Sequence, residues 1–147
     1  MESESALLGG LQRISAGTID AARIRIHGDL NLEAILVDGD EFVFYEFAGD
    51  TARSLGDRRL RRSPLWDVAD ILRSLHETAL SAASEHAQLP GGAPFPTLEP
   101  WALAWSRWAA AAFLHDYLGE MADRRLLPAD SEHLRLLLTA ILLEKTA

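Results

Sequence analysis

A segment rich in proline and glycine, residues 89–96, most restricts how this chain can fold. Proline has no backbone N–H to donate, and glycine loses much backbone entropy when a helix forms. The segment therefore predicts a loop between two helices, which we expect at about residues 63–84 and 98–121. A further helix is expected at about residues 130–145, after a loop that contains Pro128 and with Asp130 or Ser131 as its N-cap.

The first of these helices has clear signals at its start and along one face. The Ser63 side chain can accept hydrogen bonds from free N–H groups, and the fixed φ of Pro64 suits a first helical turn. Apolar residues then recur at helical spacing and predict the inner face: Val68, Ile71, Leu72 and Leu75. A short amphipathic helix is also expected within residues 3–16, where leucine and isoleucine recur at similar spacing.

The segment between residues 23 and 45 has the pattern of β-structure. Residues 23–26 alternate arginine with isoleucine, which predicts a strand with one hidden face. Apolar runs at 35–37 and 42–45 flank Asp38-Gly39, a dipeptide typical of hairpin turns because both positions tolerate positive φ. Residues 48–62 are expected to form a loop. The whole pattern predicts a mainly helical α+β fold with a small β-hairpin, built as one domain over residues 1–147.

Composition excludes several classes of function. The chain has 14 Lys and Arg against 22 Asp and Glu, a net charge of −8 that repels nucleic acids. It has no cysteine, which excludes disulfides, thiolate zinc sites and a cysteine nucleophile. No window approaches the roughly 20 apolar residues of a membrane span, and the first residues lack a basic signal region. We therefore expect a cytoplasmic protein with neither nucleic acid nor membrane as partner.

Acidic residues around the predicted hairpin follow the order of a kinase-type site. In phosphoryl transfer of this type, a catalytic-loop Asp accepts the proton of the substrate hydroxyl, while an amide side chain five residues later and a further carboxylate hold magnesium. Here Asp29, in the triplet His27-Gly28-Asp29, precedes the hairpin, and Glu46 follows it. The position of the amide is taken by Ala34, which has no ligand atom. The pattern predicts a catalytic loop beside an incomplete metal site.

Four blocks of sequence strengthen this interpretation because they follow one another in a known order. The stretch HGDLNLEAIL is similar to HGDxHLGQVL, EFAGDTARSL to DFEGEPARPL, and DRRLRRSPLWDVADILRS to ERRxxRSPLRDVAGMLRS. The last block, LEPWALAWSRWAAAAFLHDYLGE with LPADSEHLRLLLTAILLEK, is similar to a helical C-terminal region. From about Ile19 to Lys145, the chain thus resembles the C-terminal lobe of bacterial maltokinases. These aminoglycoside-phosphotransferase-like sugar kinases are often fused to trehalose synthase.

The resemblance implies both a fold and an activity. The fold is the C-lobe of a protein-kinase-like enzyme. The activity is ATP- and magnesium-dependent phosphorylation of maltose, or a related sugar, to maltose 1-phosphate in the route from trehalose to glycogen. By the same resemblance Asp29 is the catalytic base, Glu46 a metal ligand, His27 and Gly28 shape the catalytic loop, and Asp67 braces that loop from the following helix.

Departures from the family pattern lead to an alternative function. Asn31 replaces a histidine, Glu33 a glycine and Ala34 the metal-binding glutamine, while the family's DFE is here residues 46–48. The family's nucleotide-binding N-terminal lobe has no counterpart in the 26 residues before His27. The enzyme hypothesis thus requires a separate chain or domain that supplies this lobe, and the expected partners are a separate N-lobe or a trehalose synthase-like domain. The alternative is a pseudokinase-like lobe that binds sugar or serves as a scaffold, using neither ATP nor magnesium. Apolar surface left uncovered would favour a homo-oligomer.

Two clusters are open to more than one interpretation. Trp101, Trp105 and Trp108 share one face of a predicted helix, and such a stripe favours packing into a core over stacking on sugar rings. Residues 58–62 include four arginines, which suit either a solvated loop or contacts with phosphate or a partner lobe.

Overall fold

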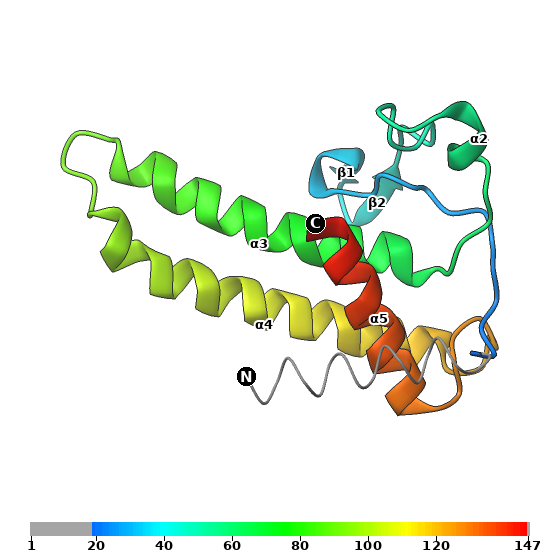
Figure 1. Cartoon of the computed structure of the whole chain (residues 1–147). Coiled ribbons are helices and arrows are strands. Elements are labelled where there is room, and N and C mark those ends of the chain that lie inside the picture. The colour runs from blue at the N-terminus through cyan, green and yellow to red at the C-terminus, as the bar shows by residue number, and fades with distance from the viewer. Residues whose placement is uncertain (1–18, 147) are drawn as a thin grey trace. The chain divides into compact units, whose positions relative to one another are not determined.

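The structure is a computed structural model that describes residues 19–146, so the helix expected within residues 3–16 lies outside the described residues. The described chain forms four α-helices and one antiparallel hairpin, which confirms the predicted mainly helical α+β class (Figure 1). The helices are α2 Leu55–Arg58, α3 Leu65–Ala87, α4 Phe95–Met121 and α5 Ser131–Thr146; the strands are β1 Ile35–Asp38 and β2 Glu41–Phe44, preceded by the 3₁₀ helix η1 Leu32–Ala34. None of the helices in this part of the chain is both long and apolar enough to cross a membrane.

The chain divides into two compact units. The first unit takes in residues 19–30, 46–69 and 121–146, and so contains α2, the start of α3, and α5. The second unit takes in residues 31–45 and 70–120, and contains the β-hairpin, the rest of α3 and nearly all of α4.

In the second unit, α3 and α4 lie side by side as a helical hairpin (Figure 1). The loop between them spans residues 88–94, close to the predicted 89–96. Helix α4 begins earlier than expected because Pro96 falls in its first turn, where a missing N–H group costs no helical hydrogen bond. Gly92 is required in this loop, since a Cβ atom there would lie 2.1 Å from the carbonyl oxygen of His86.

The β-hairpin lies where the sequence predicts it, but its turn is displaced by one residue. Ile35 pairs with Phe44 and Asp38 with Glu41, so the two-residue loop is Gly39-Asp40 and not Asp38-Gly39. Gly39 has a φ of 61°, and Asp40 is not among the residues with positive φ. The turn therefore needs glycine only at its first central position, which is the pattern of a type II′ hairpin loop.

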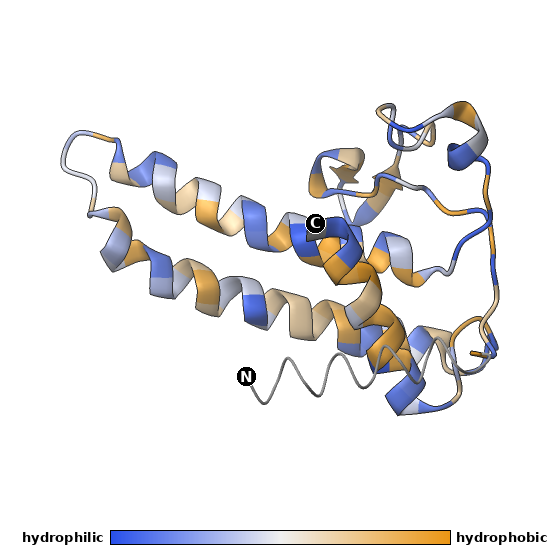
Figure 2. Cartoon of the chain, viewed as in Figure 1, coloured by the Kyte–Doolittle hydropathy of each residue, from blue (hydrophilic) through white to orange (hydrophobic). Residues whose placement is uncertain are grey.

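In the first unit, the buried start of α3 and the inner face of α5 supply most of the core. Leu65 is completely buried, and Trp66, Leu136 and Ile141 are also buried. Figure 2 shows hydrophobic positions along much of α5.

Helix α5 begins after Asp130, whose carboxylate accepts hydrogen bonds from the N–H groups two and three residues later. These two bonds identify Asp130, one of the two predicted residues, as the cap.

Two local predictions for the first unit were wrong. Residues 23–26 do not form a strand: Ile24 makes one isolated antiparallel bridge with Arg62, and the alternation of exposed and half-buried side chains persists without a ladder. Residues 48–62 are not all loop, because α2 forms one turn there. The Ser54 hydroxyl accepts a hydrogen bond from the Asp57 N–H and caps this turn.

Candidate functional site

The loop that contains Asp29 is held by the carboxylate of Asp67, in the first turn of α3. One carboxylate oxygen accepts a hydrogen bond from the His27 N–H at 2.8 Å, and the other accepts one from the Gly28 N–H at 2.9 Å. Gly28 adopts a φ of 84°, in the region that favours glycine. The contact expected of Asp67 is therefore present, and it fixes the backbone immediately before Asp29.

A second loop, residues 46–50, lies against the first. The ring of Phe47 contacts the ring of buried His27, with 4.8 Å between ring centroids. The Asp50 N–H donates to the Gly28 carbonyl at 3.4 Å, and a Cβ atom on Gly49 would lie 3.4 Å from the His27 carbonyl oxygen. Two segments about 20 residues apart in sequence thus form one paired-loop site, which we define as residues 27–29 and 46–50.

Each of the two predicted carboxylates of this site is exposed and lies on one of the paired loops. Asp29 follows the residues held by Asp67, and within residues 19–146 its side chain has no hydrogen-bond or ion-pair partner. Glu46 has a φ of 63°, unusual for a residue with a side chain, and its carbonyl accepts a hydrogen bond from the Ala48 N–H at 2.7 Å. A carboxylate without a partner can accept a proton or a hydrogen bond from a substrate hydroxyl.

The residues at the predicted metal positions do not fit a magnesium site. Ala34 is 1% exposed and has no oxygen on its side chain, so it cannot replace the ligand of the family pattern. The Asn31 amide oxygen accepts hydrogen bonds from the N–H groups of Glu33 and Ala34, and it therefore caps η1. In the part of the chain that the structure describes, no three His, Asp or Glu side chains come together as a group that could hold a metal.

The three tryptophans that share a face of the predicted helix lie on α4. Of the two interpretations given for them, packing into a core was favoured, and that expectation was wrong. Trp101, Trp105 and Trp108 are 76%, 49% and 71% exposed. Their spacing defines one face of the helix but does not determine whether a neighbouring element covers it. Trp101 and Trp105 line a cavity of about 350 Å³ together with small α3 residues such as Ala79 and Ala83. Stacking on a sugar stays a prediction.

The run of arginines is divided between different environments. The Arg58 guanidinium donates a hydrogen bond to the Ala48 carbonyl at 3.1 Å, so it holds the second of the paired loops. Arg59 and Arg61 are exposed, and Arg62 lies over the ring of Trp66 at 4.4 Å. The sequence analysis treated the four arginines as one group, either solvated or in contact with a ligand or partner. In the structure some are exposed and others contact the chain itself, so neither interpretation describes all four.

Two features of the first unit were missed by the sequence reasoning. Phe47 and Asp50 join the paired loops, and the only signal for this was their presence in the block EFAGDTARSL. Trp66 is contacted by three cations, with Arg53 at 5.4 Å and Lys145 at 4.7 Å in addition to Arg62. Nothing in the spacing of these residues predicts that cluster.

No model of a known protein family matches this chain.

Proposed function

We propose that this chain is the sugar-binding lobe of a maltokinase-like phosphotransferase, with Asp29 as the residue that receives the proton of the sugar hydroxyl. The observation that carries this proposal is the pair of hydrogen bonds from the His27 and Gly28 amides to Asp67. A catalytic base must be held in position, and these bonds fix the two residues immediately before it. A merely solvated turn needs no such support.

The proposed chemistry is attack of a sugar hydroxyl on the terminal phosphorus of ATP. As the new oxygen–phosphorus bond forms, the bond between that phosphorus and the bridging oxygen of ADP breaks, and the hydroxyl proton passes to Asp29. The substrate suggested by the sequence resemblance is maltose at its anomeric hydroxyl, which would give maltose 1-phosphate and ADP. Because Asp29 has no competing partner in the described chain, its carboxylate is available for this proton.

A specific observation favours a second candidate, a non-catalytic sugar-binding or scaffold lobe. Ala34 supplies no metal ligand, and Glu46 carries its carboxylate one methylene further from the backbone than the family's aspartate does. Charge neutralisation by metal ions supplies much of the rate of phosphoryl transfer. A lobe that has lost its metal ligands would still bind sugar at the paired-loop site but would not catalyse phosphoryl transfer by itself.

The first candidate is tested by maltose-dependent ATP consumption. The full chain would be mixed with a maltokinase N-terminal lobe and magnesium, and Asp29→Asn compared with Asp116→Asn, which alters an exposed carboxylate on α4. General-base catalysis contributes about a hundredfold or more. We therefore expect Asp29→Asn to remove at least that much of the rate and the control to retain it. Absence of turnover by the wild-type mixture would exclude the enzyme.

The second candidate is tested by calorimetry on the full chain alone. It predicts that maltose binds and that magnesium-ATP does not, with maltose affinity reduced in Asp29→Asn but unchanged in Asp116→Asn. Tight binding of magnesium-ATP would contradict the non-catalytic candidate. Failure of maltose to bind, together with absence of turnover, would contradict both.

A further inference from the structure

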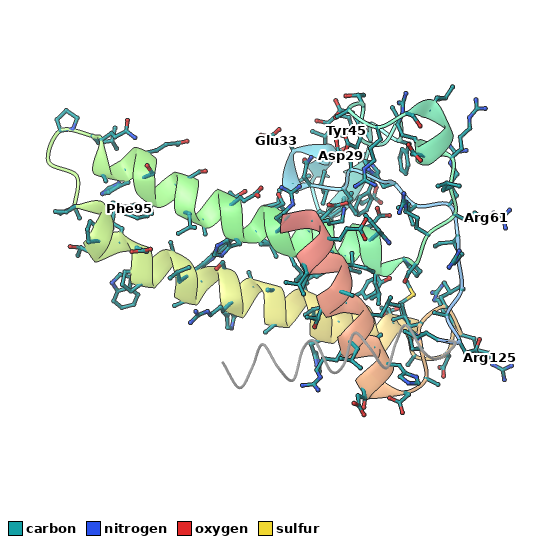
Figure 3. All side chains as sticks on the ribbon, viewed as in Figure 1. Asp29, Glu33, Tyr45, Arg61, Phe95 and Arg125 are labelled. Carbon is teal, nitrogen blue, oxygen red and sulfur yellow. The ribbon has the colours of Figure 1, made fainter. Side chains whose placement is uncertain are left out.

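The first unit contains an open cavity of about 570 Å³ that lies outside the paired-loop site. Three arginines line it: Arg23, Arg61 and Arg62. The rest of the wall is mainly apolar, with Ala22, Leu60 and Leu137 among its residues, and Trp66 also lines it. Figure 3 shows Arg61 extending outward from the segment that joins α2 to α3. The cavity is large enough for a small organic molecule, since ligand pockets typically measure about 300–1,000 Å³.

The backbone holds these arginines in place from two segments of the chain. The N–H of Ile24 donates to the Arg62 carbonyl at 2.9 Å, and the Arg62 N–H donates to the Ile24 carbonyl at 3.0 Å. Arg23 directly precedes Ile24, and Arg61 directly precedes Arg62. The bridge therefore fixes the backbone next to both arginines. The guanidinium of half-buried Arg62 is further held over the Trp66 ring at 4.4 Å.

The charges around the cavity favour an anion. No acidic residue lines it, although the chain as a whole carries a net charge of −8. Asp20, next to two lining residues, is exposed and is not itself part of the lining. Within residues 19–146, none of the three arginines forms an ion pair with a carboxylate. Within this described part of the chain, their charges are therefore available to a ligand.

We propose that this cavity binds a small organic phosphate ester. Guanidinium groups recognise phosphate oxygens through paired, charge-assisted hydrogen bonds, so Arg23 and Arg61 would bind the phosphate group. The apolar wall would contact the organic part of the ester, which inorganic phosphate lacks. This inference is independent of the chemistry proposed for Asp29, because it concerns different residues of the first unit.

The test is calorimetric titration of the full chain with phenyl phosphate, inorganic phosphate and phenol. We expect phenyl phosphate to bind more tightly than either of the other two, and its affinity to fall as salt screens the charges. Arg23→Gln and Arg61→Gln should each weaken binding on the order of tenfold, the effect of losing one or two charge-assisted hydrogen bonds at a half-solvated site. Arg61→Lys, which keeps the charge but not the planar fork, should weaken it less.

The matched control is Arg59→Gln, because Arg59 is an exposed arginine of the same run that does not line the cavity. It should bind phenyl phosphate as the wild type does, and circular dichroism should show every variant folded. Equal losses in Arg59→Gln and Arg61→Gln would overturn the proposal, because binding would then be unspecific attraction. Equal affinity for inorganic phosphate and phenyl phosphate, or equal affinity for phenol and phenyl phosphate, would overturn the assignment to a small phosphate ester.

Discussion

Removing the carboxylate of Asp67 should destabilise the whole chain more than its half-buried position suggests. In Asp67→Ala, the N–H groups of His27 and Gly28 lose their acceptors at 2.8 and 2.9 Å. Each donor left unsatisfied costs about 1–3 kcal/mol, and both bonds are only part-buried, so the expected loss is about 2–4 kcal/mol. Asp67→Asn keeps one accepting oxygen but turns its NH₂ group toward the second N–H, which predicts a loss of about 1–2 kcal/mol.

Urea denaturation followed by circular dichroism measures these losses. Asp116→Asn serves as the control, since exposed substitutions without specific contacts usually change stability by less than about 0.5 kcal/mol. Hydrogen exchange gives a local check: the His27 and Gly28 amides should exchange faster in both Asp67 variants. If Asp67→Ala is no less stable than the control, or if these two amides exchange at wild-type rates, the loop is not held by Asp67 and the reasoning fails.

Three further substitutions test other parts of the structure. Gly28→Ala should cost about 1–2 kcal/mol in urea denaturation because φ is 84° there, and wild-type stability of this variant would contradict that backbone conformation. Ala34→Gln should destabilise by about 1–3 kcal/mol without creating magnesium binding in calorimetry, since the site is 1% exposed and has no room; Glu33→Gln, on the exposed neighbour, should be neutral. Hydrogen bonds from two backbone N–H groups lower the pKa of Asp130 below 3.8. Its contribution is therefore complete above that value and is lost as pH falls through the lower folded pKa. The stability difference between wild type and Asp130→Asn should thus shrink in acid, and a constant difference would contradict the assignment.

The helical hairpin was predictable because proline and glycine act locally. Residues 89–94 contain two prolines and two glycines and do not continue a helix, so the loop between α3 and α4 follows from sequence alone. Only its end was placed too late, because Pro96 is tolerated in the first turn of α4. The single turn of α2 is too short to show periodicity, and only the Ser54 and Asp57 spacing indicates it. The alternation of residues 23–26 was real, but a ladder also needs a partner strand, and Arg62 supplies only one bridge.

The candidate site was predictable only in part, because its decisive contacts join distant residues. Asp67 lies 39 and 40 residues from the amides it binds, and helical spacing carries no information about such pairs. The resemblance of this chain's sequence blocks to those of maltokinases suggested the Asp67 contact. The pairing of Phe47 with His27 had no comparable signal. The three tryptophans of α4 show the opposite failure: their shared face was evident, but its solvent exposure depends on which elements surround the helix.

The charged tip of the β-hairpin affects whether two copies of the chain can pair through their strands. Val37 and Phe42 pair across the strands, yet both are exposed. Within residues 19–146 each strand of this two-stranded sheet has an edge that pairs with no further strand, and an identical hairpin could align there. Asp38, Asp40 and Glu41 crowd the tip with negative charge. Such gatekeeper charges repel a second copy before its strands can add to the sheet. Negative charge at the tip thus opposes the pairing of two identical hairpins, and concentrated salt weakens this repulsion by screening it.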